Sequence, residues 1–572
     1  LGVMDITLTR VDYAQIGTAS KGCMRVIAAD KDDKKKKTRS LDKVVCGGHS
    51  GVVLCIARKN AETQVVFKTM PGPRIDCLRL GGALGTVQDK IFVACENYVK
   101  GYSKKGKQFF AFETNMAEPV SSMYIYGVDM FLCGRLSFNH YHDCADANYY
   151  LCNDRINDVL CLPVVEGSWV GRGITPVLAC DDKTIKVLQG SELNYEVQLG
   201  DIPCVLHLFM NDGGFSKQRV LYGTKDGRIG LVDLPPTDGT LVWEIPTRSS
   251  SAITSIHCYA ITGSGCPDII VGKEDGLIEI YVVDFSDQAS FKKSFQCEES
   301  IVSLQCGRVS SESFDEIVAC TYTGWVFALS TEPIVKPRKD ALTTLAPHLE
   351  VKVQQVRNEL EELEQKVSEE RQRYHQLTLQ EGSAVAAVPR FAVQDHFTLD
   401  KSLACYMLSI ELIVPIDYIL LQSDVGVELL DVEKNSAVVS MTTPDEKSGN
   451  ALLATYRCQA NTTRIEMRIR SIEGQYGTVQ VYICPKIHPK MCQVRAYSIK
   501  PLSLHQRVHE FDTSRPLNVL RITGNFSLSE AHQWINLLVS QVPERVPPQE
   551  SVTFNFASTF NGGTQLQATY RY

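Results

Sequence analysis

The chain of 572 residues is too long for one hydrophobic core, so we expect several domains. Its composition, with 44% hydrophobic residues, is ordinary for a globular protein, and its net charge of −7 argues against a general nucleic-acid binder. The twenty cysteines stand singly, without a Cys-x-x-Cys pair, which indicates the reduced thiols of a cytosolic protein rather than a disulfide framework.

The beginning of the sequence, LGVMDITLTRVDYAQIG, has no basic segment followed by an apolar run, so we expect no signal peptide. The most apolar stretch, CYMLSIELIVPIDYILLQ, is interrupted by Glu411, Pro415 and Asp417. It is too short and too polar to span a bilayer. We therefore expect a protein that is cytosolic, or at most peripheral to a membrane.

A short phrase recurs through the first 330 residues: an apolar run, a Gly, two polar residues, Asp-Gly and an alternating apolar strand. It is clearest in LYGTKDGRIGLVDL at 221–234 and in VGKEDGLIEIYVVD at 271–284. Related tips fall near residues 51, 98, 183 and 324, and the one interval of double length predicts a further copy near residue 140. Seven units of about 40 to 50 residues predict a seven-bladed β-propeller over residues 1–335.

Asp226-Gly227 and Asp275-Gly276 fit the tips of hairpins, because glycine readily adopts the positive φ angles of a tight turn. A calcium loop would need a ladder of alternating Asp or Asn ligands, which both phrases lack. We therefore interpret the phrase as turn chemistry rather than as a metal site.

The segment NHYHDC carries a second metal alternative, because His140 and His142 share one strand face and Asp143 and Cys144 follow them. Zinc is conceivable there, but no second ligand pair with suitable spacing appears. We expect a half-buried strand, no metal and no cofactor. The chain contains no G-x-x-x-x-G-K-[ST], H-E-x-x-H or G-x-S-x-G motif, so we expect no catalytic residues, and a propeller dehydrogenase or hydrolase is the less favoured alternative.

The basic tract Lys34–Lys37, with Arg39, has three interpretations. It could be a nuclear signal or bind anionic lipid. Asp32 and Asp33 dilute its charge, so a loop between two blades is the simplest interpretation.

A Pro- and charge-rich linker, TEPIVKPRKD, ends the repeats, and residues 336–385 are predicted to form this linker and a coiled coil. Apolar residues advance there in steps of four and three for about four heptads, as in an amphipathic helix that needs a partner helix. The narrow seam favours a partner chain over packing on the chain's own propeller, because a docked helix shows a wider apolar face. The predicted seam consists of Leu349, Val353, Val356, Leu360, Leu363, Val367, Tyr374 and Leu377.

Residues 391–497 return to a β pattern and predict a small β-sandwich. In TTRIEMRIRSIEGQYGTVQVYI, apolar residues alternate with polar ones on both sides of two glycines, which predicts a hairpin. Arg464, Arg468 and Arg470 form a basic stripe along this segment. The stripe is either a solvated strand face or a binding site for an acidic peptide.

Residues 500–572 change pattern once more. GNFSLSEAHQWINLLVSQVPERVPP predicts a helix with a capping box formed by Ser527 and Glu530, ending before Pro543. The strand-like segment SVTFNFAS follows. We expect the beginning of an α/β module that can continue beyond Tyr572.

Together these segments predict a mainly β, multidomain protein: a seven-bladed propeller, a coiled-coil helix, an ear-like sandwich and a platform-like α/β module. Within this order stand the long segments MDITLTRVDY, VFKTMPGPRI, KGKQFFAFETN, NYYLCNDRINDVLCLPV, ITPVLACDDKTIKVLQGS, LLATYRCQANTTRIEMRIRSIEGQYGT and QVRAYSIKPLSLHQR. In its order of domains and in these segments the chain resembles a subunit of the BBSome, the ciliary coat complex, along essentially its whole length. Departures are the KDDKKKKTRS loop, the three residues before Met4 and the early end, since the family continues into a helical C-terminal region.

The resemblance implies a non-enzymatic coat subunit that helps to carry membrane proteins into and out of primary cilia. It implies pairing with the second Bardet–Biedl subunit through the coiled coil, contact with the ninth, and assembly by chaperonin-like Bardet–Biedl proteins. It also implies an indirect link to an Arf-like GTPase, cargo and the ciliary membrane, and a location at the ciliary base and cilium. The alternative is a propeller scaffold of another vesicle coat.

Overall fold

In the computed structural model, β-strands are the main regular secondary structure, and the described residues contain two α-helices. The described residues are 6–29, 41–59, 62–163, 174–209, 218–284, 286, 288–333, 347–380, 391–442, 449–487 and 490–571. By its internal contacts the chain divides into two units. One unit contains residues 1–333, 400–404 and 502–572, and the other contains residues 334–399 and 405–501. The predicted basic loop at Lys34–Lys37 lies outside the described residues.

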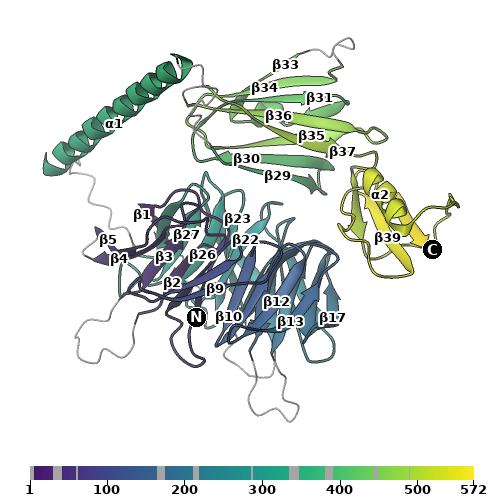
Figure 1. The fold of residues 1–572 in the computed structure, drawn as a ribbon, viewed down its shortest axis with the longest axis horizontal. Coiled ribbons are helices and arrows are strands. Elements are labelled where there is room, and N and C mark those ends of the chain that lie inside the picture. Colours follow the sequence, from purple (N-terminus) through teal and green to yellow (C-terminus); the bar gives the residue numbers. More distant parts are fainter. Residues whose placement is uncertain are drawn as a thin grey trace. The chain divides into compact units, whose positions relative to one another are not determined.

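The first unit contains seven four-stranded antiparallel sheets, which are the blades of the predicted propeller (Figure 1). Buried apolar side chains fill the space between consecutive blades, as in the cluster that joins the strands within residues 175–189 to those within residues 219–233. The strands of the first four blades are β2 (Met24–Ile27), β3 (Lys43–Gly47), β4 (Val53–Lys59), β5 (Glu62–Lys68), β6 (Cys77–Gly81), β7 (Lys90–Cys95), β8 (Tyr98–Tyr102), β9 (Gln108–Glu113), β10 (Ser122–Tyr126), β11 (Asp129–Cys133), β12 (Ser137–His142), β13 (Ala145–Leu151), β14 (Ile156–Leu162), β15 (Thr175–Cys180), β16 (Thr184–Gln189) and β17 (Glu192–Gln198). The strands of the other three are β18 (Pro203–Phe209), β19 (Arg219–Thr224), β20 (Arg228–Asp233), β21 (Thr240–Pro246), β22 (Ile253–Tyr259), β23 (Asp268–Lys273), β24 (Leu277–Val283), β25 (Ala289–Gln296), β26 (Ile301–Gly307), β27 (Glu316–Thr321), β28 (Trp325–Ser330) and β1 (Thr9–Gln15).

The last blade is closed by the beginning of the chain. Strand β1 pairs antiparallel with β28, so that Thr9 lies opposite Ser330 and Gln15 lies opposite Trp325. The seventh blade is therefore built from both ends of the propeller sequence.

The recurring phrase forms the hairpin between the second and third strands of a blade, as predicted. Gly227 and Gly276 have φ angles of 78° and 83°. A Cβ atom at Gly276 would lie only 2.1 Å from the carbonyl oxygen of Cys297. Glycine is thus required twice, by the left-handed backbone and by the close approach of the following segment. The copy expected near residue 140 is the β11–β12 hairpin of the third blade.

In the second unit, α1 (Pro347–Gln380) is one continuous helix of 34 residues, visible in Figure 1. All eight residues of the predicted seam, from Leu349 to Leu377, lie on this helix. The side chains of residues 347–349, 371, 374–375 and 377–380 lie outside the described residues, so Leu349, Tyr374 and Leu377 are placed on the helix by their backbone alone.

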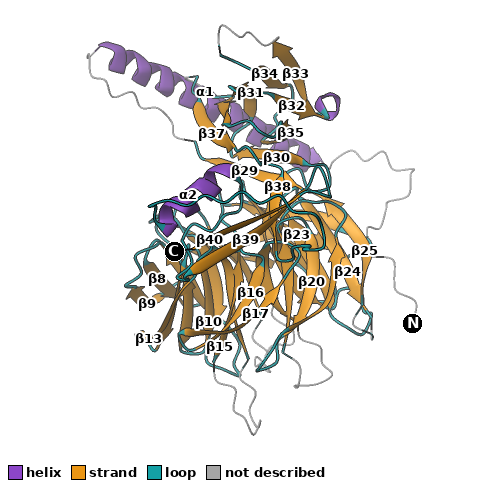
Figure 2. Ribbon diagram, turned by 90° about the vertical axis from the view of Figure 1, so that its right-hand side faces the viewer, coloured by secondary structure: helices purple, strands orange, loops and turns teal. Residues whose placement is uncertain are grey.

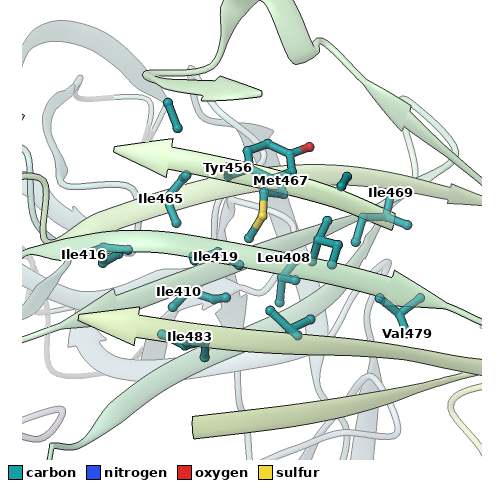
Figure 3. Packing of buried hydrophobic residues seen from close by; sticks show 14 of the residues in the cluster. Leu408, Ile410, Ile416, Ile419, Tyr456, Ile465, Met467, Ile469, Val479 and Ile483 are labelled. Atoms are coloured by element: carbon teal, nitrogen blue, oxygen red, sulfur yellow. The ribbon is translucent and has the colours of Figure 1, made fainter. Parts of the chain in front are cut away.

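The second unit also contains the predicted sandwich, whose two sheets have the strand orders β29-β30-β35-β32 and β33-β34-β31-β36-β37. Their inner faces share one apolar core that includes Leu408, Met467 and Val479 (Figure 3). Its elements are β29 (Val393–Asp400), β30 (Cys405–Leu412), β31 (Ile416–Ser423), β32 (Val427–Leu430), the 3-10 turn η1 (Val432–Lys434), β33 (Ala437–Thr442), β34 (Leu452–Cys458), β35 (Arg464–Ser471), β36 (Gly477–Pro485) and β37 (Gln493–Ile499).

The predicted hairpin over residues 464–483 is wrong. Strand β35 pairs with β30 and β32, whereas β36 pairs with β31 and β37 in the opposite sheet. The segment Ile472–Tyr476 therefore crosses between sheets instead of turning within one. Alternation identified the buried faces correctly, since Ile465 and Ile483 are both in the core, but alternation does not determine which strand is the neighbour.

Residues 502–572 form a small α/β module within the first unit. Its sheet has the order β38 (His505–Val508), β39 (Ser551–Ser558) and β40 (Gln565–Arg571), and α2 (Leu528–Leu538) lies along it (Figure 2). The predicted capping box is present: Glu530 N donates to Ser527 Oγ over 3.2 Å, and Ser527 N donates to Glu530 Oε2 over 2.7 Å. Ala531 on the helix packs against Phe554 on the sheet.

Neither helix of the described chain is long and apolar enough to cross a membrane.

Candidate interaction surfaces

The predicted seam lies on a helix surface that is open to solvent. Every side chain of α1 that the structure describes is exposed. Leu360 and Leu363, at the centre of the seam, are 56% and 59% exposed. Val353, Val356 and Val367 are exposed on the same stripe. An uncovered row of Val and Leu on a helix is typical of a surface that another helix covers.

The three arginines of the predicted stripe lie side by side on the outer face of β35, and each faces an acidic side chain of the sandwich. Arg464 Nη2 lies 2.5 Å from Glu466 Oε1, Arg468 pairs with Asp431, and Arg470 Nη1 lies 3.5 Å from Glu428 Oε2. The peptide site stays a prediction. An acidic peptide would have to displace these carboxylates.

His140 and His142, the pair weighed for zinc, both turn to one carboxylate. His140 Nε2 lies 2.8 Å from Asp129 Oδ1 and His142 Nδ1 lies 2.7 Å from the same oxygen. Asp143 and Cys144 occupy the following turn with positive φ angles of 48° and 65°. Within the described ranges, no group of three His, Cys, Asp or Glu side chains is arranged to hold a metal ion.

A ring of side-chain acceptors surrounds the propeller axis, and no sequence pattern predicts it. The innermost strand of a blade leaves backbone N–H groups without a strand partner, and side chains of the preceding blade accept from them. Leu206 N donates to Asp158 Oδ2 over 3.0 Å, from the fifth blade to the fourth. Val26 N donates to Gln305 Oε1 over 2.8 Å, from the first blade to the seventh.

Two histidines continue this ring. Cys258 N donates to His207 Nε2 over 3.3 Å, and Cys306 N donates to His257 Nδ1 over 3.2 Å. The surrounding blades remove water from both imidazoles, which lowers the pKa of His207 to about 4 and that of His257 to about 3. Both rings are therefore neutral near pH 7, as an accepting nitrogen requires.

Two arginines lie beside the same axis. Arg25 on β2 donates from Nη1 to its neighbour's carbonyl, Met24 O, over 2.8 Å. Arg79 on β6 approaches Asp158 Oδ1 with Nη2 at 3.5 Å. Their adjacency could not be read from the sequence, because they are 54 residues apart and the ring of blades brings them together.

The α/β module is attached to the propeller through side chains of its first strand. Arg507 Nη1 donates to Asp154 Oδ2 over 2.8 Å, and Lys183 Nζ donates to the carbonyl of Arg507 over 2.6 Å. His509 Nε2 lies 3.2 Å from Lys183 O. Lys183 has a positive φ of 63° at the tip of its hairpin, so this degenerate copy of the repeat supplies a contact where other copies carry glycine.

Family profiles cover most of the chain in three segments. The profile described as the BBS7 beta-propeller matches residues 24–331, the BBS7 GAE domain matches 389–497 and the BBS7 platform domain matches 505–572.

Two curated proteins are similar over nearly the whole chain. The Caenorhabditis elegans BBSome complex member bbs-7 is 46% identical over 98% of this chain and 77% of its own length. The Mus musculus BBSome complex member BBS7 is 46% identical over 99% of this chain and 78% of its own length. A crystal structure of BBS1N in complex with ARL6DN is 13% identical with a TM-score of 0.43, covering 58% of this chain and 98% of that one, a likeness too distant to support a conclusion. On the profiles and the two relatives, the chain belongs to the BBS7 family of BBSome subunits.

Proposed function

We propose that the chain is a non-catalytic structural subunit of the BBSome, the coat-like complex that sorts and transports membrane proteins to and from primary cilia. Membership of the BBS7 family supports this, since the similar worm and mouse proteins are named BBSome complex members. A non-catalytic role is also supported by the polar groups at the propeller axis. Asp158, His207 and His257 are occupied in holding blades together.

The proposed location is the cytoplasm, the ciliary base with its basal body and centrosome, and the cilium, where the chain is peripheral to the ciliary membrane. The proposed partners are other BBSome subunits, with the second paired through α1 and the ninth as a neighbour, and chaperonin-like factors in assembly. The link to an Arf-like GTPase and to cargo is indirect. We propose a propeller at 1–335, a linker and coil at 336–385, an ear at 391–497 and a platform at 500–572.

The observation that carries the pairing is the exposure of the α1 seam. Most of the stability of a helix in a protein comes from packing of its amphipathic face rather than from helix propensity. Yet the central residues Leu360 and Leu363 are more than half exposed. Each of them is worth about 1.5 to 3 kcal/mol when fully buried, so a partner helix would gain substantially by covering the seam.

The test is a double substitution in the seam, Leu360→Asp with Leu363→Asp, followed by co-purification with the second Bardet–Biedl subunit. We expect pairing to be lost, because two carboxylates would be buried in an apolar seam without partners. The matched control is Asn358→Asp with Gln365→Asp. It adds the same two charges to exposed positions on the opposite face of the helix and should leave pairing intact.

Thermal melting of the whole chain shows whether either variant disturbs the propeller. Normal binding by the seam variant would exclude this surface as the interface. Equal loss in both variants would attribute the effect to helix charge rather than to the seam.

A further inference from the structure

Two arginines beside the propeller axis carry more positive charge than the carboxylate of Asp158 balances, and we propose that these residues, Arg25 and Arg79, bind an oxoanion there, a carboxylate or a phosphate. This goes beyond the role of a coat subunit. The two arginines come from the innermost strands of consecutive blades, β2 and β6. Both guanidinium groups lie at one point of the backbone, Gly22. A Cβ atom on Gly22 would be 2.9 Å from Arg79 Nη1 and 3.7 Å from Arg25 Nη2.

The charge at this point is not balanced by the protein. Arg79 donates to the neutral carbonyl of Leu78 over 3.4 Å, and its contact to a carboxylate, Asp158 Oδ1, is long at 3.5 Å. That oxygen already accepts from Ser122 Oγ over 2.8 Å. Within the described part of the chain, Arg25 has no carboxylate partner. His207 is neutral near pH 7 and does not compensate the arginines. The single carboxylate of Asp158 can therefore balance at most one of the two positive charges.

A third cation stands next to the pair. Lys21 immediately precedes Gly22, its side chain is exposed, and its ammonium group donates to the carbonyl of Cys204 in the fifth blade. The bond from the first blade to the fifth places this amine across the axis from its own strand. An anion at Arg25 and Arg79 would therefore also lie within the field of Lys21.

Guanidinium chemistry identifies the ligand class. Its planar fork of N–H groups matches two oxygens on one centre, which carboxylates and phosphates both provide. The side chain of Arg79 is 18% exposed and that of Arg25 is also partly exposed, so the group can be reached from solvent. Low hydration beside the axis strengthens such a pair relative to a surface contact.

Isothermal titration calorimetry on the whole 572-residue chain tests the proposal, with inorganic phosphate and acetate as separate probes at ionic strength held constant by sodium chloride. We expect saturable binding of one anion per chain. Arg25→Gln should weaken it about tenfold or more, since charge-assisted hydrogen bonds are lost. Arg25→Lys should also weaken it, because an ammonium cannot present the fork.

The matched control is Lys107→Gln, which removes the same charge from an exposed residue just before β9 and should leave affinity unchanged. Thermal melts keep loss of binding separate from loss of fold, and Arg25 is the deciding position because it does not contact Asp158. A response to phosphate alone assigns a phosphate ligand, and a response to acetate assigns a carboxylate. No saturable binding of either anion, or equal weakening by Lys107→Gln, would overturn the proposal.

Discussion

Arg507 Nη1 lies 2.8 Å from Asp154 Oδ2 and joins two residues that are 353 positions apart in the chain. Their side chains are only 19% and 10% exposed. Despite this cation, burial raises the pKa of Asp154 to about 6. The desolvation of the carboxylate therefore outweighs its attraction to the guanidinium. Without Arg507, a buried negative charge on Asp154 would be strongly destabilising.

Replacing Arg507 with Met should lower the free energy of unfolding by about 3 kcal/mol at pH 7, because a buried carboxylate loses its cation. The double variant with Asp154→Leu should recover most of that loss, because no charge is left buried. Urea denaturation of the two single variants and the double variant completes the cycle. Simple addition of the two single effects would show that the side chains are not coupled.

The same pair predicts a pH dependence. Without Arg507 the pKa of Asp154 rises further above its unfolded value, so the folded state takes up a proton that the unfolded state takes up only near pH 4. Stability of the Arg507→Met variant relative to the native chain should therefore improve as pH falls below 7. Denaturation at pH 7 and pH 5 measures this, and a penalty that is equal or larger at pH 5 would contradict it.

The two axial histidines predict a loss of stability in mild acid. His207 and His257 have pKa values of about 4 and about 3 when folded, against about 6.5 when unfolded. As pH falls below 6.5, the two imidazoles are protonated in the unfolded state but stay neutral in the folded state. Each histidine should then cost about 1.4 kcal/mol per pH unit, down to its folded pKa.

Two substitutions isolate this effect. His207→Gln and His257→Asn put a carbonyl oxygen near each accepting nitrogen, as Gln305 does in the same ring, but do not titrate. Between pH 7 and pH 5 the double variant should lose less stability than the native chain. Parallel pH profiles would show that these imidazoles do not control the acid response.

A comparison of Gly276 with Gly85 distinguishes two requirements for glycine, a left-handed backbone and the lack of space for a Cβ atom. Both have positive φ angles, 83° and 75°, but a Cβ atom meets nothing within 4 Å at Gly85. Gly85→Ala should cost about 1 to 2 kcal/mol, from the left-handed backbone alone. Gly276→Ala should cost about 1 to 3 kcal/mol more, because the new methyl group collides with the backbone at Cys297. If thermal denaturation showed an equal loss of stability in both variants, the backbone φ angle alone would explain the requirement for glycine.

The arginine stripe on β35 can be tested by removing the competing acids. If the stripe binds an acidic peptide, Glu428→Gln with Asp431→Asn should raise the affinity, and Arg468→Gln with Arg470→Gln should abolish binding. Stability should change by less than about 1 kcal/mol per exposed pair. Fluorescence anisotropy with a labelled poly-glutamate peptide measures both effects, and unchanged affinity in both double variants would leave the stripe as a solvated strand face.

Repetition and local chemistry made much of the fold predictable. The Asp-Gly dipeptides predict hairpins because the positive φ angle of the glycine is a local property of the turn. The Ser527–Glu530 capping box is likewise a local hydrogen-bond pattern. The partner of β35 was missed because sheet pairing depends on distant segments. Ile465 and Ile483 carry the same alternation whether their strands pair or face each other across a core.

The candidate sites divide in the same way. The α1 seam is visible in the sequence because its spacing lies within one helix. The axial ring is not, because Asp158, His207 and His257 each look like an isolated polar residue in an apolar strand. Only closure of the blades brings each of them to the backbone of the next strand.

Because β1 pairs with β28, the propeller cannot close until its last strand has been synthesised. The strand Thr9–Gln15 leaves the ribosome before the other strands of the propeller, yet its partner ends at Ser330. Until that partner emerges, the nascent first strand has no edge to join and the seventh blade is incomplete. During this interval β1 and the open sides of the first and sixth blades are available to other proteins. The propeller therefore spends most of its own translation as an open arc, the stage at which holding factors would be needed.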